Sequence, residues 1–235
     1  MGKVIMSGIV PQVVAPSKFK LDATFSNNTW EAIAWACQEK KVPETWVVGD
    51  QKTMTINGTD YAIDIIGKDH DIYSDGTGTA PLTFQMHHCY STWYYMNSPA
   101  TNVGGWHNSQ IRTTHLPAIM ALMPSEVQSG LKEVDKFTSA GSQSSTITTS
   151  ADKLFLLSEI EVFGTNTYSF SGEGRSYEYY SAGNSAKKTT VSGSGRYWWT
   201  RSPATSSQYA FVSIWENSIE AQSTNDHYIS FAFCF

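Results

Sequence analysis

The chain has 235 residues, of which 16% are charged and 13% aromatic, and its formal net charge is −5. This length suits one large domain better than two, and we expect residues 1–20 to form an arm or linker ahead of a single domain over residues 21–235. Paired basic residues occur at Lys40-Lys41 and Lys187-Lys188, too few to favour nucleic-acid binding, which draws on many phosphate contacts. No apolar run reaches the roughly 20 residues of a membrane-spanning helix, and no signal peptide is visible.

The three cysteines, Cys37, Cys89 and Cys234, have neither CxxC nor Cys/His metal spacing. We expect all three to be buried apolar residues. A disulfide between two of them stays an open alternative at this stage.

The first expected element is a helix that ends before Pro43. Asn28 and Glu31 have the spacing of a capping box, in which we expect the Asn28 side chain to cap the helix and Glu31 to reach back. Downstream, four apolar residues at i, i+3, i+4 and i+7 define one helical face: Trp30, Ile33, Ala34 and Cys37.

A hairpin and a strand follow. Asn57-Gly58 separates the strand-like runs 53–56 and 61–66, and this dipeptide favours a tight turn because both residues tolerate a positive φ. Residues 69–80 are polar and contain glycine, which indicates a loop, and residues 82–86 alternate as a strand does.

The middle of the chain predicts short elements. We expect a helix capped by Asn108 or Ser109 and broken at Pro117, and a second one opening at Pro124. A third begins at Ser158 and ends at Gly164. Strands are expected at 134–138 and 153–157, residues 139–150 are too polar for the core, and residues 172–194 are expected to be irregular.

The C-terminal part is expected to consist of short strands at 197–200, 209–214 and 229–235. In the last strand, large apolar residues (Ile229, Phe231, Phe233 and Phe235) alternate with small ones, so its aromatic side should pack on a core and the chain should end inside a sheet. Pro203 forces Ser202 into the extended state. For Arg201 we expect a structural role, stacked on a tryptophan or bonded to loop carbonyls.

The segment from Ala204 to Tyr228 mixes frame and display residues. Apolar strand-like positions (Phe211, Val212, Ile214, Ile219 and Ala221) are interleaved with Tyr, Trp, Ser and Asn, the side chains that antibody paratopes favour. Trp215 should point outward if Ile214 points inward, although it could instead fold over a neighbouring loop. The predicted ligand-binding residues are Thr200, Ser206, Gln208, Tyr209, Ser213, Trp215, Glu216, Ser218, Glu220, Gln222, Asn225, Asp226, His227 and Tyr228.

Catalytic signals are weak. The six histidines fit no nucleophile or metal pattern. Asp69-His70-Asp71 could hold a cation, and Asp226-His227 could act as an acid or base, but each is better explained as an ordinary loop. We therefore expect no catalytic residues, no metal and no cofactor.

Several motifs occur in a fixed order: Gly49-Asp50 followed by residues 53–67, Gly104-Gly105-Trp106 leading to Gln110-Ile111-Arg112, LFLLSEIEVFG at 154–164, YWWTRSP at 197–203, and the closing residues 231–235. Together they resemble the DUF6273 family. The resemblance implies an α+β, C-type lectin-like fold of the formylglycine-generating-enzyme subtype, with many short strands, few helices and long ordered loops. It also implies kinship with the variable proteins of diversity-generating retroelements, whose C-terminal region is mutated to retarget binding and which include phage tail proteins.

The sequence departs from two activities of related folds. Oxidases of this fold use a cysteine pair near the C-terminus, and here Cys234 stands alone in that region; calcium-dependent lectins carry Glu-Pro-Asn or Trp-Asn-Asp motifs, which are absent. We therefore expect a non-enzymatic receptor-binding protein of a phage tail or cell surface, recognising a protein or glycan on a target cell, with homo-oligomers possible. The alternatives are an enzyme of the same broad fold and a purely structural virion protein.

Overall fold

The computed structural model describes residues 18–235, so the predicted arm at 1–20 lies almost wholly outside the described residues. The fold is α+β, with few helices and four small antiparallel sheets. The described chain contains no helix that is both long and apolar enough to cross a membrane.

A five-stranded antiparallel sheet forms the centre of the molecule, in the order β1-β2-β3-β12-β6. Its strands are β1 (Gln51–Ile56), β2 (Thr59–Lys68), β3 (Leu82–Met86), β12 (Ala232–Cys234) and β6 (Leu154–Phe155). The predicted hairpin is confirmed: β1 and β2 pair around Asn57 and Gly58, whose φ angles are 48° and 76°. Strand β12, which is part of the strand predicted at 229–235, lies between β3 and β6 in this sheet.

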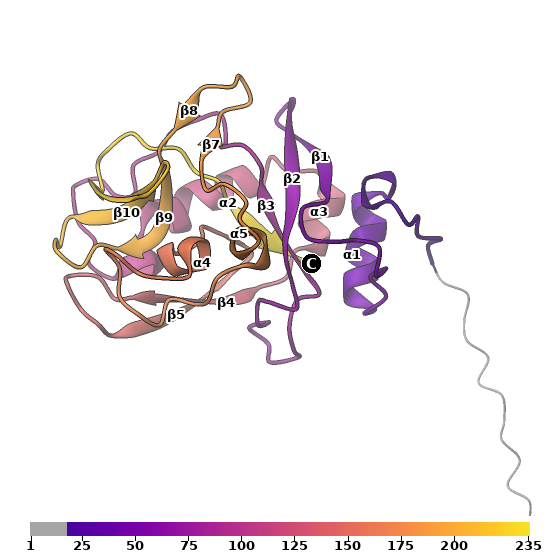
Figure 1. Cartoon of the computed structure of the whole chain (residues 1–235), viewed down its shortest axis with the longest axis horizontal. Coiled ribbons are helices and arrows are strands. Elements are labelled where there is room, and N and C mark those ends of the chain that lie inside the picture. The colour runs from indigo at the N-terminus through magenta and orange to yellow at the C-terminus, as the bar shows by residue number, and fades with distance from the viewer. Residues whose placement is uncertain (1–17) are drawn as a thin grey trace, which may run out of the picture.

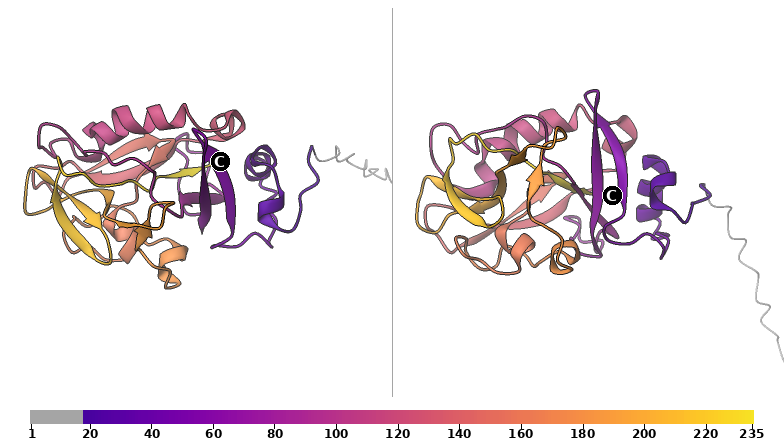
Figure 2. Two further views of the ribbon diagram at one scale, coloured as in Figure 1. Left: turned by 90° about the horizontal axis from the view of Figure 1, so that it is seen from above. Right: turned by 45° about the horizontal axis from the view of Figure 1, so that its top comes forward.

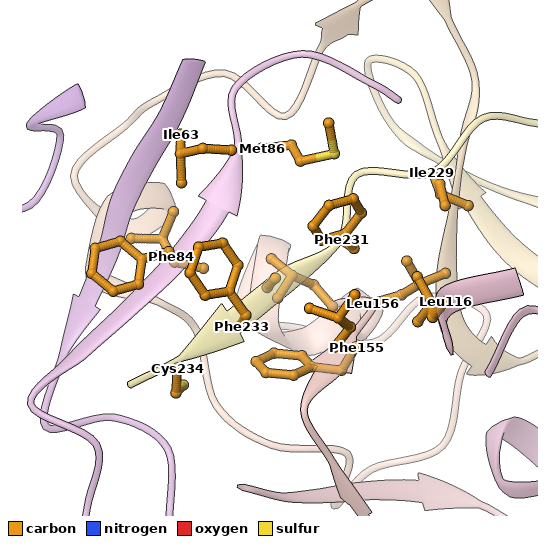
Figure 3. Packing of buried hydrophobic residues seen from close by; sticks show 14 of the residues in the cluster. Ile63, Phe84, Met86, Leu116, Phe155, Leu156, Ile229, Phe231, Phe233 and Cys234 are labelled. Carbon is orange, nitrogen blue, oxygen red and sulfur yellow. The ribbon is translucent and has the colours of Figure 1, made fainter. Parts of the chain in front are cut away.

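Strand β12 is buried on both faces. Phe233 pairs with Phe84 of β3 on one side and with Leu154 of β6 on the other, and the Phe84 and Phe233 ring centroids lie 5.2 Å apart (Figure 3). Trp30 packs edge-on against the rings of Phe84, Phe233 and Phe235. The predicted aromatic side of the last strand therefore fills the core, although the regular strand is shorter than residues 229–235.

Helix α1 (Trp30–Gln38) buries the predicted face against this sheet, but the predicted cap is wrong. Thr29 accepts the hydrogen bond from the Ala32 N–H. The Asn28 amide is instead engaged with the preceding loop, where it donates to the carbonyls of Asp22, Thr24 and Phe25. That loop includes the 3₁₀ turn η1 (Phe25–Asn27). Helix α3 (Ser125–Gly130) was predicted correctly and crosses α1 at Gly130.

The predicted break at Pro117 is also wrong. A 3₁₀ turn, η2 (Gly105–Asn108), precedes a π-helical turn, η3 (Ile111–His115), which runs directly into α2 (Leu116–Met120). The Leu116 N–H reaches the Ile111 carbonyl, five residues back. Pro117 lies in the first turn of α2, directly after the π-helical turn.

Regular elements occur in the stretch 139–150, which was predicted to be too polar for the core, and in residues 172–194, which were predicted to be irregular. The hairpin of β4 (Val134–Ser139) and β5 (Ile147–Asp152) takes in part of the polar stretch 139–150. Ser139 and Ser150 are buried there, because such polar groups find partners: the Ser139 hydroxyl donates to the Ser144 carbonyl at 2.6 Å. Residues 172–194 include α5 (Glu178–Ser181) and β7 (Lys188–Thr189), which pairs with β8 (Gly195–Arg196). Helix α4 (Glu159–Phe163) has the predicted end at Gly164 and a Ser158/Glu161 capping box.

The remaining sheet stands at the end of the molecule opposite α1, in all three views (Figures 1 and 2). It has the order β11-β10-β9, formed by β11 (Ser218–Gln222), β10 (Ala210–Ile214) and β9 (Trp198–Pro203). The strand predictions near 197–200 and 209–214 are confirmed, with β9 extending further to Pro203. Strand β11 was not predicted as a strand.

Because Phe233 is fully buried on β12, an inner strand of the five-stranded sheet, Phe233→Ala should lower the free energy of unfolding by about 3–5 kcal/mol through lost burial and a residual cavity. Urea denaturation measures this loss. Val191→Ala is the control, since Val191 is 43% exposed and its truncation should change stability by about 0.5 kcal/mol or less. Equal losses in the two variants would contradict the assigned core.

Candidate functional site

The β9–β11 sheet is anchored to the rest of the fold by a buried ionic network. Arg201, in the middle of β9, is fully buried and forms a two-pronged ion pair with Glu161 of α4. Its guanidinium also donates to the carbonyls of Phe137, Leu156 and Glu173. The predicted structural role is thus confirmed, through loop and strand carbonyls.

The network continues to the central sheet through Lys136. Its ammonium lies 2.7 Å from Asp71 and 2.8 Å from Glu161, and the Tyr177 hydroxyl donates to Asp71. Burial acts to raise the pKa of Asp71, but the Lys136 charge and hydrogen bonds outweigh it and bring this pKa down to about 2. The pKa of Glu161 is likewise lowered, because Arg201 and Lys136 offset its desolvation. Both carboxylates are therefore ionised partners of buried cations.

One of the weak catalytic candidates lies at this network. Donor atoms of His70, Asp71 and Glu161 all lie within 4.8 Å of one another, beside a cavity of about 260 Å³. The two carboxylates are already hydrogen-bonded to Lys136, Arg201 and Tyr177, and the His70 ring stacks on Tyr177 at 3.8 Å. A metal ion here would have to displace buried cations, so the geometry favours a structural role.

The predicted ligand-binding residues divide into three groups. Two are buried and are corrections to the prediction: Thr200 is fully buried and donates to the Val212 carbonyl, and Ser213 is fully buried on β10. They are enclosed because β10 is the central strand of its sheet and β9 packs on the core. Exposed residues form the second group: Ser206, Gln208, Tyr209, Glu216, Gln222, Asn225 and Asp226. The third group is half-buried: Trp215, Ser218, Glu220, His227 and Tyr228.

Trp215 does not stand free. Its ring lies so close to Gly195 of β8 that a Cβ there would come within 1.8 Å of it, and the Lys187 ammonium sits 4.6 Å from the ring centroid. Lys187 also pairs with Glu216 at 2.6 Å. The indole therefore covers the β7–β8 hairpin, which was the alternative interpretation, and only part of it is open to solvent.

His227 is oriented inward beneath the exposed residues. Its ring packs against Trp199 at 4.5 Å and Tyr197 at 5.4 Å, and its Nδ1 atom has no hydrogen-bond partner. Desolvation lowers the pKa of His227 to about 4, while its neighbour Asp226 is exposed. An acid or base role for Asp226 and His227 together is not favoured, because the Asp226 side chain is exposed whereas the His227 ring is packed inward.

Loops from an earlier part of the chain hold residues 204–228, which we call the display segment, in place, and sequence reasoning missed them. Asn102 is fully buried, and its side-chain amide donates to the carbonyls of Ser207 (2.7 Å) and Ala210 (2.8 Å). Its backbone N–H donates to the carbonyl of Gln208. Ser223 acts as an acceptor: its carbonyl accepts from the Asn97 N–H and its hydroxyl accepts from the Thr101 N–H. The available signal was weak, since a lone asparagine in a polar stretch looks like loop.

The same stretch adds exposed apolar side chains near the predicted site. Trp93, Tyr95 and Val103 are 43%, 37% and 57% exposed, and the Tyr94 N–H donates to the His227 carbonyl at 2.9 Å.

The cysteines are free and buried, as expected, and burial raises the pKa of each thiol.

The comparisons with known proteins give a family. Residues 85–231 match the model described as "Domain of unknown function (DUF6273)". This match covers more than half of the chain, so the chain belongs to that family. No curated protein and no solved structure matches the chain.

Glu173 is buried beside Ser202 and the Ser139 N–H, and desolvation raises its pKa to about 7. The pKa of this carboxyl is near 4.5 in the unfolded chain, so between pH 4.5 and pH 7 the folded protein binds more protons than the unfolded one. The free energy of unfolding that Glu173 contributes is therefore fully present below pH 4.5 and is lost as the pH rises to 7 and above. Glu173→Gln should therefore gain stability relative to wild type by a few kcal/mol between pH 5 and pH 8. Urea denaturation of both proteins across this range measures the difference, and a pH-independent difference would contradict the assignment.

Proposed function

We propose that this chain is a non-enzymatic recognition protein that presents residues 205–228 to a protein or glycan on a target cell. The observation that carries the proposal is that the side chains which hold this segment in place are buried, whereas other side chains of the same segment are exposed to solvent. Exposed polar and aromatic side chains lie on loops whose backbone is fixed by buried side chains, chiefly Asn102 and Ser223. A preformed surface of this kind loses little conformational entropy on binding.

The frame residues are those that a binding surface would leave unchanged. Trp198, Trp199, Phe211 and Ile214 are fully buried, so replacing them would damage the core. Replacement of an exposed residue such as Gln208 or Asn225 should change stability by about 0.5 kcal/mol or less. A surface that tolerates substitution on a fixed frame is what diversification requires, which supports the proposed kinship with variable proteins of diversity-generating retroelements.

The finer fold assignment belongs to the same proposal. We infer a C-type lectin-like fold of the formylglycine-generating-enzyme subtype. Its support is the α+β architecture with short antiparallel sheets, the C-terminal strand as an inner strand of one sheet, and a separate small sheet that carries the display loops (Figure 1). A phage tail or a cell surface is the proposed setting.

The enzymatic alternative has less support. The His70–Asp71–Glu161 cluster is engaged in ion pairs and hydrogen bonds, and the His227 ring is packed between Tyr197 and Trp199. Both arrangements are explained by structure alone.

The test is binding of the fluorescently labelled chain to a panel of intact bacterial cells. The triple variant Tyr209→Ala/Gln222→Ala/Asn225→Ala should lose about ten-fold or more in affinity for any cell that wild type binds, because interface energy concentrates in few residues. Its thermal unfolding should match wild type, since all three side chains are exposed.

The matched control is Lys20→Ala/Glu44→Ala/Val47→Ala, which changes three exposed residues at the α1 end of the molecule. It should bind as wild type does. If both triple variants bind equally well, the display segment is not the binding surface. A reverse transcriptase gene and a near-copy of the coding sequence beside this gene would support the retroelement link, and their absence would count against it.

A further inference from the structure

Two exposed aromatic side chains adjoin the display segment without belonging to it. Trp93 is 43% exposed and Tyr95 is 37% exposed. Their ring centroids lie 5.5 Å apart with the planes tilted by 55°. Large rings left open to water in this way mark binding surfaces more often than small exposed apolar groups do.

The backbone places these rings beside Asp226. Tyr94 and His227 form an antiparallel bridge, and bridged residues point to the same side. Both of their rings face the core, since Tyr94 packs on Tyr90 and His115 while His227 packs on Trp199. Of their neighbours, Trp93, Tyr95 and Asp226 are exposed, as alternation predicts, whereas Tyr228 is half-buried and packs against the core. These four residues form what we call the aromatic platform: Trp93, Tyr95, Asp226 and Tyr228.

The platform is held rigidly from below. The Trp199 indole donates to the Tyr94 carbonyl at 2.8 Å, and the Tyr94 N–H donates to the His227 carbonyl at 2.9 Å. Trp199 is fully buried. The two exposed rings thus extend from a backbone that is fixed before any ligand arrives, which limits the entropy cost of binding.

The chemistry of the platform suits a neutral, polyhydroxylated ligand. Aromatic faces carry negative potential, which attracts the weakly positive C–H groups on one face of a pyranose ring. Around the rings, Ser91, Thr92 and Asn225 are exposed and offer neutral donors and acceptors, while the Asp226 carboxylate can accept from sugar hydroxyls. The nearby cation, Arg196, is placed over the Tyr228 ring at 5.5 Å.

The extent of the platform also favours a small ligand. A stable protein–protein interface buries roughly 800 Å² on each partner around an apolar centre, far more than two half-exposed rings provide. We propose that the aromatic platform binds a neutral saccharide by ring stacking, without a metal ion. This inference rests on the proposed recognition function and names the ligand class for one part of that surface.

The experiment is a glycan array of neutral saccharides probed with the full chain in EDTA, followed by titration of each hit by intrinsic tryptophan fluorescence. Trp93→Ala and Tyr95→Ala should each weaken binding about ten-fold or more. Tyr95→Phe, which keeps the ring, should retain most of the affinity. Ile72→Ala, which truncates a side chain 47% exposed elsewhere on the surface, should have no effect. Thermal denaturation of every variant verifies folding.

The outcomes separate this inference from the broader function. Saccharide binding that both alanine variants retain would overturn the platform as the site. If no glycan on the array binds and protease treatment of the cells abolishes cell binding, the ligand is a protein. That result would overturn the saccharide proposal and leave the proposed recognition function intact. If the chain binds neither cells nor glycans, both proposals fail.

Discussion

Arg201 lies in the middle of β9 with its guanidinium fully buried, and it connects the β9–β11 sheet to other parts of the chain. It pairs with Glu161 of α4, donates to the Phe137 carbonyl of β4, and donates to the carbonyl of Glu173 in the loop after α4. Removing one partner of such a pair would leave an uncompensated buried charge. The position of the display end relative to the core therefore depends on this residue.

Lys136 extends the same constraint to Asp71, and the Tyr177 hydroxyl is hydrogen-bonded to that carboxylate. Polar groups that are fully satisfied in a buried network fix one arrangement, since any shift would leave some of them unpaired. The buried network therefore explains how the fold holds long irregular loops in place although its sheets are small. Under the proposed function, rigidity at the base leaves the exposed residues available for contact with a ligand.

The display segment combines two environments within a few residues. Thr200 and Ser213 are enclosed in the sheet, whereas Gln208, Asn225 and Asp226 are open to solvent. Residues that came from another part of the chain, Trp93 and Tyr95, adjoin this surface through the Tyr94–His227 bridge. The recognition surface of the proposal is therefore discontinuous in sequence, as many binding surfaces are.

Local chemistry alone determined the Asn57-Gly58 hairpin, the face of α1, the Ser158/Glu161 cap and the aromatic alternation of the last strand, because each depends on neighbours within a few residues. Long-range partners decided the rest. Asn28 lost its capping role to carbonyls at 22–25, Pro117 entered a helix through a π-turn, and Trp215 covered Gly195. Which polar residues of the C-terminal segment face water was likewise a tertiary matter, since period-2 alternation cannot show that β10 is covered on both faces.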